Sequence, residues 1–536
     1  MFLTEEGIKN PSEWQEKNYK LPTYNRAMIR ENTIKSPFWL HFGAGNIFRA
    51  FQARVIEDML NQGTLNRGLI VVEGYDYEII KNVYQPHDDL SLAVTLKADG
   101  TMEKQVIGSV VESLCFDCED DEELSRLKEI FANPSLQIVS FTITEKGYNY
   151  KNSNGELFEA IQKDMTQGPK NPESYMGKVT TLLYERFLKG ATPIAMVSMD
   201  NCSRNGDKLR EVIVEFAKAW QENGLVTGDF VGYVTTKDKV SFPWTMIDKI
   251  TPRPDSMVEE MLIEDSLVDI QPIITSKNTY IAPFVNSEEC EYLVIEDDFP
   301  NGREALEAGG FIFTTRETVE NVERMKVCTC LNPLHTTLAI FGCLLDYHLI
   351  SEEMKDPLLA QLVHEIGYVE GLPVVVDPKI ISPLKFIDEV VTKRIPNPFL
   401  PDTPQRIATD TSQKLAIRFG ETIKAYMNSN NRDVNSLNKI PLVFAGWLRY
   451  LMGVDDNGQK FTLSSDPMLD ELTEIMSKIT IGSMEHVDDI KKIISNPIIF
   501  GVDLYEVGLG EKVEQYFKQM IDSIGAVRCT LKSNAL

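Results

Sequence analysis

The stretch PFWLHFGAGNIFRAFQARVIEDMLNQG (37–63) decides the fold class predicted for this chain. It begins with a short apolar run, passes through a turn that holds Gly43 and Gly45, and continues into a segment whose apolar residues recur every four positions. This order predicts a buried strand, a tight turn and an amphipathic helix that ends near Gly63. Such a unit is typical of the start of a dinucleotide-binding α/β fold.

Further short apolar or β-branched runs follow, and we predict strands at LIVVE (69–73), LQIVSFTIT (136–144), PIAMVS (193–198) and DFVGYVTT (229–236). Several of these runs lead directly into polar residues. Functional groups of a doubly wound sheet lie beyond the carboxyl ends of its strands. The first half is therefore predicted to be a Rossmann-like α/β domain.

After about residue 300, helical spacing replaces the strand-like runs. Amphipathic patterns predict helices at 334–349, 383–394, 404–427, 440–452, 466–479, 485–495 and 509–524. We expect an N-terminal extension (1–36), a Rossmann-like NAD-binding domain (37–298) and a mostly α-helical substrate-binding domain (299–536).

The composition favours a small-molecule partner. With 80 acidic and 54 basic residues the formal charge is −26, which would repel nucleic acid or an anionic membrane. The start of the chain lacks a secretory pattern, and no apolar stretch reaches the ~20 residues of a membrane span. We expect a cytoplasmic protein. Its eight cysteines and six histidines show no zinc-site spacing, so we expect no metal site.

The glycine turn carries the first candidate site. Gly43 and Gly45 would let a pyrophosphate approach the backbone at a helix N-terminus, and Arg49 would add positive charge. Because Phe48 stands in place of the third glycine of the fingerprint, a plain strand-to-helix turn is the alternative. At the end of the next strand, Glu73 would accept hydrogen bonds from ribose hydroxyls and favour NAD over NADP. Asp76 competes for this role, and either acid is alternatively a solvated turn residue.

Two later clusters hold candidate catalytic residues. Asn201 follows a predicted strand and would polarise a carbonyl oxygen, or alternatively organise a turn. Lys326 would act as an acid/base group if burial or cationic neighbours lowered its pKa. Asn332 and His335, three positions apart, share a helix face and would hold a substrate oxygen. The alternative is that Asn332-Pro333 starts a helix and His335 is a core residue.

Five ordered segments together resemble the long-chain mannitol dehydrogenase family of polyol dehydrogenases and hexuronate reductases. They are GAGNIFRAFQA (43–53), TITEKGY (142–148), SMDNCSRNG (198–206), FPWTMIDKITP (242–252) and KVCTCLNPLH (326–335). The resemblance implies an NAD-binding domain, a helical domain, an active site between them, and zinc-independent oxidation or reduction of a sugar alcohol or sugar acid.

The resemblance also implies a role for each candidate residue. Lys326 would be the acid/base group, Asn201 and Asn332 would stabilise the alkoxide, His335 would orient the substrate, and Glu323 would relay the proton. Asp248 would lie near the substrate, and Arg394 would bind its far end. The residues expected to contact the cofactor are Gly43, Gly45, Asn46, Arg49, Glu73, Asp76, Thr144 and Glu145.

The sequence departs from the family pattern at one place. The family usually has five positions from the lysine to the asparagine, whereas Lys326 and Asn332 are six apart. One extra residue on a continuous α-helix rotates a pair by about 100°. We therefore expect a bulge or break before Pro333, or a role that has moved.

The sequence leads to one hypothesis and two alternatives. The chain is closest to the uronate branch of the family, which implies NAD-dependent interconversion of a keto-uronate and an aldonate, D-fructuronate and D-mannonate. The first alternative is oxidation of mannitol to fructose by the same residues. The second is a non-catalytic NAD-binding sensor.

Overall fold

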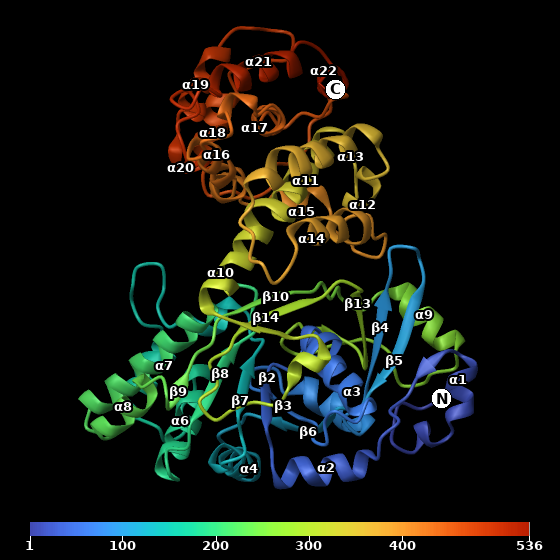
Figure 1. The fold of residues 1–536 in the computed structure, drawn as a ribbon, viewed down its shortest axis with the longest axis vertical. Helices are drawn as coiled ribbons and strands as arrows, with labels where there is room; N and C mark the ends of the chain where they lie inside the picture. The colour runs from blue at the N-terminus through green and yellow to red at the C-terminus, as the bar shows by residue number, and fades with distance from the viewer. Residues whose placement is uncertain (535–536) are drawn as a thin grey trace. The chain divides into compact units, whose positions relative to one another are not determined.

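A computed structural model describes residues 1–534. The chain folds into two compact units (Figure 1). The first comprises Met1–Leu96 and Thr101–Glu320, and the second comprises Lys97–Gly100 and the chain from Asn321 onward. The boundaries expected at residues 36 and 298 stay predictions.

A parallel sheet of six strands forms the centre of the first unit. Its order is β6-β3-β2-β7-β8-β9, with every neighbouring pair parallel. The strands are β2 (Trp39–Phe42), β3 (Leu69–Glu73), β6 (Val110–Cys115), β7 (Ile138–Phe141), β8 (Ile194–Ser198) and β9 (Val240–Ser241). Counted along the chain this is the order 3-2-1-4-5-6 of a dinucleotide-binding fold. The order reverses between β2 and β7, the position at which such folds bind their ligands.

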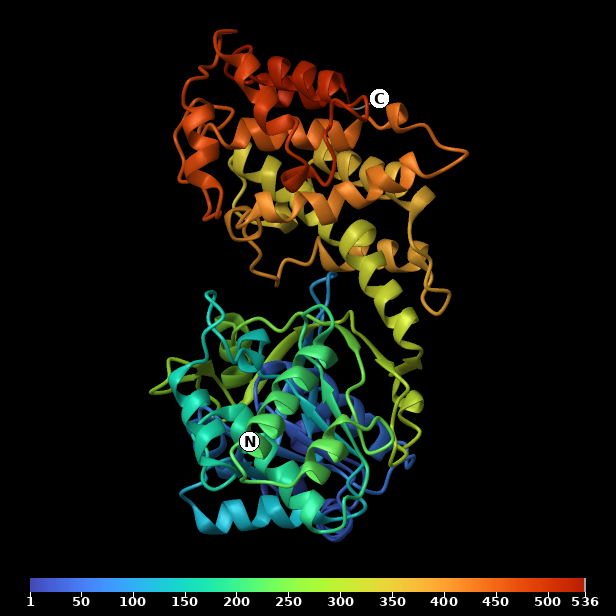
Figure 2. The ribbon, with the colours of Figure 1, turned by 90° about the vertical axis from the view of Figure 1, so that its left-hand side faces the viewer.

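Both faces of this sheet are buried, which explains why its strands are continuous apolar runs. Leu40 and Phe42 pack into one core cluster, and Trp39 packs into the other. The first cluster includes residues of α4 (Asp121–Ala132), α6 (Tyr175–Leu188), α7 (Asn205–Glu222) and α8 (Gly228–Thr235), and the second includes η2 (Phe48–Ala53) and α3 (Arg54–Asn61). Figure 2 shows the α7–α8 side turned toward the viewer, in green.

The remaining elements of the first unit flank this sheet. One further sheet has the order β1 (Tyr19–Lys20), β5 (Met102–Ile107), β4 (Ser91–Leu96) and β13 (Phe284–Glu288). Another has the order β10 (Thr245–Asp248), β14 (Tyr292–Glu296) and β15 (Ile312–Thr314), and β11 (Ile273–Ile274) pairs with β12 (Tyr280–Ile281). The other helices are α1 (Pro11–Glu16), α2 (Arg26–Lys35), α5 (Glu159–Gln167) and α9 (Ser256–Glu264).

The predicted strand at 229–236 is wrong, because this segment forms helix α8 (Gly228–Thr235). The run DFVGYVTT contains Phe230, Tyr233 and Val234, which are buried while Val231 is only partly covered. Spacings of three and four place the buried side chains on one helical face. The run is short and rich in β-branched and aromatic residues, which favour strands. Its composition therefore predicted a strand although the spacing of its apolar residues is helical.

Beyond α10 (Arg316–Met325), which crosses from the first unit into the second, the described chain is helical as predicted. The longer helices are α11 (Asn332–Leu344), α13 (Pro357–His364), α14 (Pro383–Glu389), α16 (Glu421–Met427), α17 (Lys439–Tyr450), α18 (Leu469–Met476), α21 (Gly510–Met520) and α22 (Ala526–Ser533). The short ones are α12 (Ile350–Glu353), α15 (Pro404–Ile407), α19 (Lys491–Ile494) and α20 (Pro497–Phe500). The single helix predicted over 404–427 is broken into several pieces.

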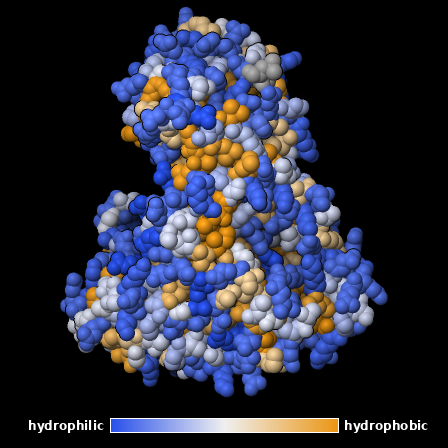
Figure 3. Space-filling view, viewed as in Figure 1, coloured by the Kyte–Doolittle hydropathy of each residue, from blue (hydrophilic) through white to orange (hydrophobic). Residues whose placement is uncertain are grey.

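One helical run within residues 1–534, Arg316–Leu344, is long and apolar enough to cross a membrane by length and composition alone. Its apolar window is 83% buried inside the protein, as expected for a core helix. On the face shown in Figure 3, hydrophilic residues predominate and apolar residues form separate patches.

Candidate functional site

The two glycines of the 43–45 turn serve different purposes. Gly43 has a φ of 109°, and a Cβ atom there would lie 2.3 Å from the carbonyl oxygen of Thr142. The fold itself therefore requires glycine at this position. A Cβ atom at Gly45 would meet no atom of the described chain within 4 Å. Packing does not demand a glycine there, so its small size leaves room for a ligand to approach the backbone.

Backbone and side-chain contacts hold this turn on both sides. The Gly43 amide donates to the carbonyl of Val72 at 2.8 Å. The Ala44 amide donates to Glu73 at 3.0 Å, and the Tyr84 hydroxyl donates to the Ala44 carbonyl at 3.1 Å. The turn is thus held in one shape by the neighbouring strand β3 and by η3 (Ile80–Tyr84).

Phe48, which replaces the third glycine, stacks on a buried histidine. The rings of His41 and Phe48 are 4.2 Å apart and nearly parallel. Burial lowers the pKa of His41 to about 3, so the ring is neutral at physiological pH. Its Nδ1 and Nε2 atoms pair with the hydroxyls of Ser140 and Thr142 on the β7 side. This stack gives the helix a packed start where other dinucleotide folds use a glycine.

Arg49 is completely buried and supports the turn from inside. Its guanidinium donates to the carbonyl of Ala282 at 2.6 Å and to the side chain of Asn46 at 2.8 Å. Arg49 contacts the turn by this hydrogen bond to Asn46, so its positive charge lies beneath the start of the helix. A direct contact between Arg49 and a cofactor stays a prediction.

Glu73 lies at the end of β3, beside the turn. Its carboxylate accepts from the amides of Ala44, Tyr75 and Asp76, and burial raises its pKa. Asp76 is buried and accepts from the Thr275 hydroxyl at 2.6 Å. Glu73 therefore links the glycine turn to the loop after β3, whereas Asp76 faces another loop. Of the two acids, Glu73 is the better placed to meet a ribose bound over the turn.

These features fit a dinucleotide at the carboxyl edge of the sheet. A helix begins directly after the turn, so its first N–H groups are available to a pyrophosphate. The open side of Gly45 gives that group access, and Glu73 supplies a hydrogen-bond acceptor one strand away. The donor set suits a dinucleotide, which lies across the point where the strand order reverses.

The next candidates follow β7 and β8. Thr144 is exposed, with a φ of 65°, and its amide donates to Asp200 at 2.8 Å. Glu145 is exposed and pairs with Lys208. Asn201 directly follows Asp200, and its side chain is exposed. The structure thus brings the Thr144 loop and the Asn201 turn together through Asp200, a residue that the sequence analysis did not single out.

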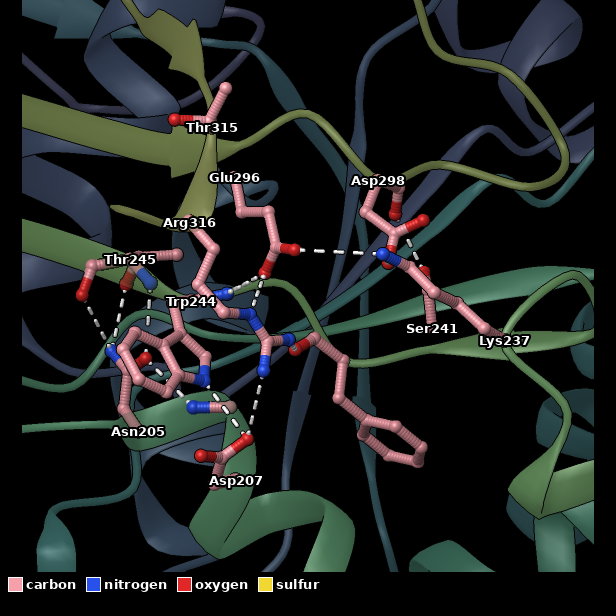
Figure 4. Close-up of polar contacts among 12 residues, drawn as sticks. Asn205, Asp207, Lys237, Ser241, Trp244, Thr245, Glu296, Asp298, Thr315 and Arg316 are labelled. Carbon is pink, nitrogen blue, oxygen red and sulfur yellow. Dashed lines mark hydrogen bonds and ion pairs between the residues drawn. The ribbon is translucent and has the colours of Figure 1, made fainter. Parts of the chain in front are cut away.

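Asp248 ends strand β10 and is buried. The start of this strand is tied to α7, because Asn205 donates to the backbone and hydroxyl of Thr245 and accepts from its amide (Figure 4). Figure 4 also shows Arg316, the first residue of α10, between Glu296 and Asp207. The start of α10 is therefore fixed on the first unit.

In the second unit, Lys326 opens a π-helical segment, η7 (Lys326–Cys330). The Leu331 amide donates to the Lys326 carbonyl five positions earlier, at 3.1 Å, and α11 begins at Asn332. The expected bulge before Pro333 is confirmed. A π turn absorbs one extra residue, so six positions here rotate the pair about as far as five on a regular helix. The Lys326 side chain is only 5% exposed.

His335 lies on α11, where the charges of Asp402, Arg394 and Arg418 act on its imidazole. Burial lowers the pKa of His335 to about 4, the Asp402 charge opposes this shift, and Arg394 and Arg418 add to it. The imidazole is therefore neutral at physiological pH and offers one donor and one acceptor. Arg394 is buried at the end of η10 (Val390–Arg394). The charge of Arg394 acts on His335, as does that of Arg418, whose guanidinium donates to the hydroxyl of Thr336, the next residue of α11. The roles expected for His335 and Arg394 stay predictions, and Arg418 was not among the residues predicted from the sequence.

Comparisons with known proteins agree with this architecture. The family profile of the mannitol dehydrogenase Rossmann domain matches residues 38–308, and that of the mannitol dehydrogenase C-terminal domain matches residues 318–521. A D-mannonate oxidoreductase of Thermotoga maritima is 53% identical over 535 residues, covering 99% of this chain and 98% of that protein. A mannitol 2-dehydrogenase of Cereibacter sphaeroides is 30% identical, covering 82% and 84%.

Two solved structures share the fold. Pseudomonas fluorescens mannitol 2-dehydrogenase, in a ternary complex with NAD and D-mannitol, has a TM-score of 0.68 at 26% identity and covers 99% of each chain. A substrate-free D-sorbitol dehydrogenase has a TM-score of 0.79 at 24% identity, covering 98% of this chain and 99% of that one. The chain belongs to the mannitol dehydrogenase family. The resemblance and the fold class predicted from the sequence are confirmed.

Proposed function

We propose that this protein is an NAD-dependent oxidoreductase that interconverts D-fructuronate and D-mannonate. The similarity to a D-mannonate oxidoreductase extends over nearly the whole of both chains. The observation on the structure that supports the substrate class is the presence of two arginines, buried Arg394 and Arg418 on Thr336, whose charges both act on His335. A guanidinium binds a carboxylate through two parallel hydrogen bonds, and a carboxylate distinguishes a uronate from a polyol.

Lys326 is the proposed acid/base group. In oxidation, its neutral amine takes the proton of the substrate hydroxyl, and in reduction the ammonium returns it. NAD, when bound, accepts or supplies the hydride at the same carbon. Glu323, one turn before Lys326, relays the proton to solvent.

Asn201 and Asn332 complete the proposed machinery. Their amide groups donate hydrogen bonds to the oxygen on which negative charge develops, which lowers the barrier most in a site that excludes water. His335, neutral at physiological pH, orients the substrate. Arg394 binds the carboxylate, and Asp248 contacts the substrate hydroxyls.

The remaining proposed residues bind the cofactor. Gly43, Gly45 and Asn46 form the pyrophosphate turn with Arg49 beneath it, and Thr144 and Glu145 contact the nucleotide from the loop after β7. Glu73 accepts from the ribose hydroxyls and repels a 2′-phosphate. This metabolic role agrees with a cytoplasmic location.

The test is NADH consumption with D-fructuronate, D-tagaturonate and D-fructose, with EDTA present throughout. We expect turnover of D-fructuronate to exceed that of the other two, unaffected by EDTA. A preference for D-fructose would instead favour the second candidate, a mannitol 2-dehydrogenase, which the 30% identity to such enzymes supports. NADH binding without turnover of any substrate would indicate a sensor and contradict both.

A further inference from the structure

Buried Tyr148 and half-buried Asp200 form a polar pair that the proposed chemistry does not use. The Tyr148 hydroxyl lies 2.5 Å from one carboxylate oxygen of Asp200 and 2.8 Å from the Ser198 hydroxyl. Tyr148 is 3% exposed. Burial raises the pKa of both groups, so the phenol keeps its proton and donates it to the carboxylate. The contact ties the end of strand β8 to the loop after β7.

The same carboxylate also holds two backbone amides of that loop. Asp200 accepts from Ile143 at 3.0 Å and from Thr144 at 2.8 Å. Thr144 has a φ of 65° and a ψ of 159°, a strained conformation for a non-glycine residue that persists only where surrounding contacts enforce it. Asp200 provides two such contacts, one of them to the amide of Thr144 itself.

The backbone of Asp200 is fixed from its other side. The Asn205 side chain donates to the Asp200 carbonyl at 3.0 Å, and Asn205 is itself bound to Thr245 on β10 (Figure 4). The turn that carries Asn201 is therefore held between β7 and β10. Asn201 is adjacent to a residue that has little freedom, although its own side chain is exposed.

We infer that Tyr148 and Asp200 are positioning residues, which fix the Asn201 turn and the Thr144 loop relative to each other before a ligand binds. The inference rests on the proposed function, since it assigns Asn201 to the reacting oxygen and Thr144 to the nucleotide. Positioning of this kind matters because a small misplacement of a catalytic group lowers the rate strongly. One carboxylate thereby couples the loop expected to meet the nucleotide with the residue expected to meet the substrate.

The test compares Tyr148→Phe and Asp200→Asn with two matched controls. Tyr150→Phe removes a hydroxyl two residues away, one that donates to exposed Glu211 at 2.6 Å. Asp164→Asn alters a buried carboxylate that likewise accepts two backbone amides and one hydroxyl, from Glu173 and Ser174. For each protein we would measure amide hydrogen exchange over residues 142–148, NADH affinity by fluorescence titration, kcat and thermal stability.

Both test variants should exchange the Ile143 and Thr144 amides faster and should lower kcat by about tenfold or more, the expected effect of losing a hydrogen bond to a charged group. The controls should keep native exchange over 142–148 and native kcat, even though Asp164→Asn lowers the melting temperature. A purely structural role would make Tyr148→Phe behave like Asp164→Asn, and that result would overturn the inference.

The design separates this inference from the proposed function. If the native protein turned over none of the three substrates, the proposed function would fail, while hydrogen exchange and NADH affinity would still decide the positioning role. If Asp200→Asn did not fold, Tyr148→Phe would decide it, because that change keeps the ring in place. Native exchange over 142–148 in Tyr148→Phe would contradict the inference whatever the activity.

Discussion

At the scale of single residues, Lys326 combines burial with a place in the π-helical segment that brings it toward Asn332. Replacing it with alanine removes the proposed proton acceptor. We expect Lys326→Ala to slow the hydride step by at least about 10²-fold, the low end for a positioned acid/base group, with NADH affinity unchanged. Single-turnover kinetics with bound NADH would measure this.

Arg324→Ala is the matched control for that experiment. Arg324 is an exposed cation two residues away, and it pairs with Glu421 at 3.4 Å. Its removal should leave the hydride step near the native rate. A Lys326→Ala protein with native single-turnover rates would assign proton transfer to another group.

Glu353 is a fully buried carboxyl group that lies outside the proposed catalytic residues. Both its carboxyl oxygens lack a hydrogen-bond partner within the described chain. Burial, with a smaller contribution from the Asp356 charge, raises the pKa of Glu353 to about 10. The folded protein therefore keeps a proton that the unfolded chain loses above its ordinary pKa of 4.5. Between these two values, each pH unit lowers the free energy of unfolding by about 1.4 kcal/mol on account of this group.

Glu353→Gln should remove that pH dependence. We expect the free energy of unfolding, measured by denaturant titration, to fall less steeply from pH 5 to 8 in the variant than in the native protein. The variant should gain stability relative to the native protein as pH rises. Glu352→Gln, which changes the exposed neighbour, should leave the native slope. Parallel curves for native and Glu353→Gln proteins would mean that the carboxyl is ionised in the fold.

The sequence predicted residues whose role depends on local spacing. Gly43, Gly45 and Glu73 could be predicted because a turn and the end of a strand are each defined by a few consecutive residues. The pair Tyr148 and Asp200 could not, because 52 positions separate them and only the neighbouring strands β7 and β8 bring them together. Both residues lie within motifs singled out in the sequence, at 142–148 and 198–206. The order of residues in these motifs does not show which of their side chains are in contact.

At the scale of elements, the segment η7 decides whether Lys326 and Asn332 act together. The Thr422 hydroxyl donates to the Cys328 carbonyl at 3.3 Å, satisfying an acceptor where the regular helical bonding is interrupted. The sequence anticipated a bulge because the spacing differs from that of the family. The strand predicted at 229–236 was wrong for a different reason. A run of eight residues covers only about two helical turns, too few to show the spacing of three and four that marks a helix.

Deleting Val327 tests this account of η7. Val327 is the least buried of the five residues from Lys326 to Cys330, and its removal restores the spacing of five. We expect the shortened segment to form a regular α-helix, so that the protein folds and keeps measurable turnover. Deleting Ala339 from the buried α11 should instead rotate the rest of that helix by about 100° and disrupt its packing. Circular dichroism melts and kcat would show the difference. Equal damage from both deletions would contradict the account.

At the scale of the whole molecule, the strand order was predictable only as a class. Alternating strands and helices indicated a doubly wound sheet, and the order β6-β3-β2-β7-β8-β9 confirms it. The short strands β10 to β15 were not predicted, because pieces of two to five residues depend on partners from distant parts of the chain. Net charge, by contrast, follows directly from composition and acts over the entire protein.

A formal charge of −26 destabilises a compact state through self-repulsion, in keeping with the hydrophilic face in Figure 3. Salt screens this repulsion, with a Debye length that shrinks from about 30 Å at 0.01 M to about 8 Å at 0.15 M. We therefore expect the melting temperature to rise by a few degrees, equivalent to about 1 kcal/mol, when salt is raised over that range. Differential scanning calorimetry would measure the rise.

Sodium and potassium chloride should raise the melting temperature equally, because screening depends on ionic strength and not on the identity of the cation. The opposing effect is the loss of surface ion pairs, such as those of Arg303 with Asp297 and Glu307. Exposed pairs of this kind contribute about 0–1 kcal/mol each, so their weakening should not reverse the trend. A melting temperature that falls with salt would show that local pairing outweighs the net repulsion.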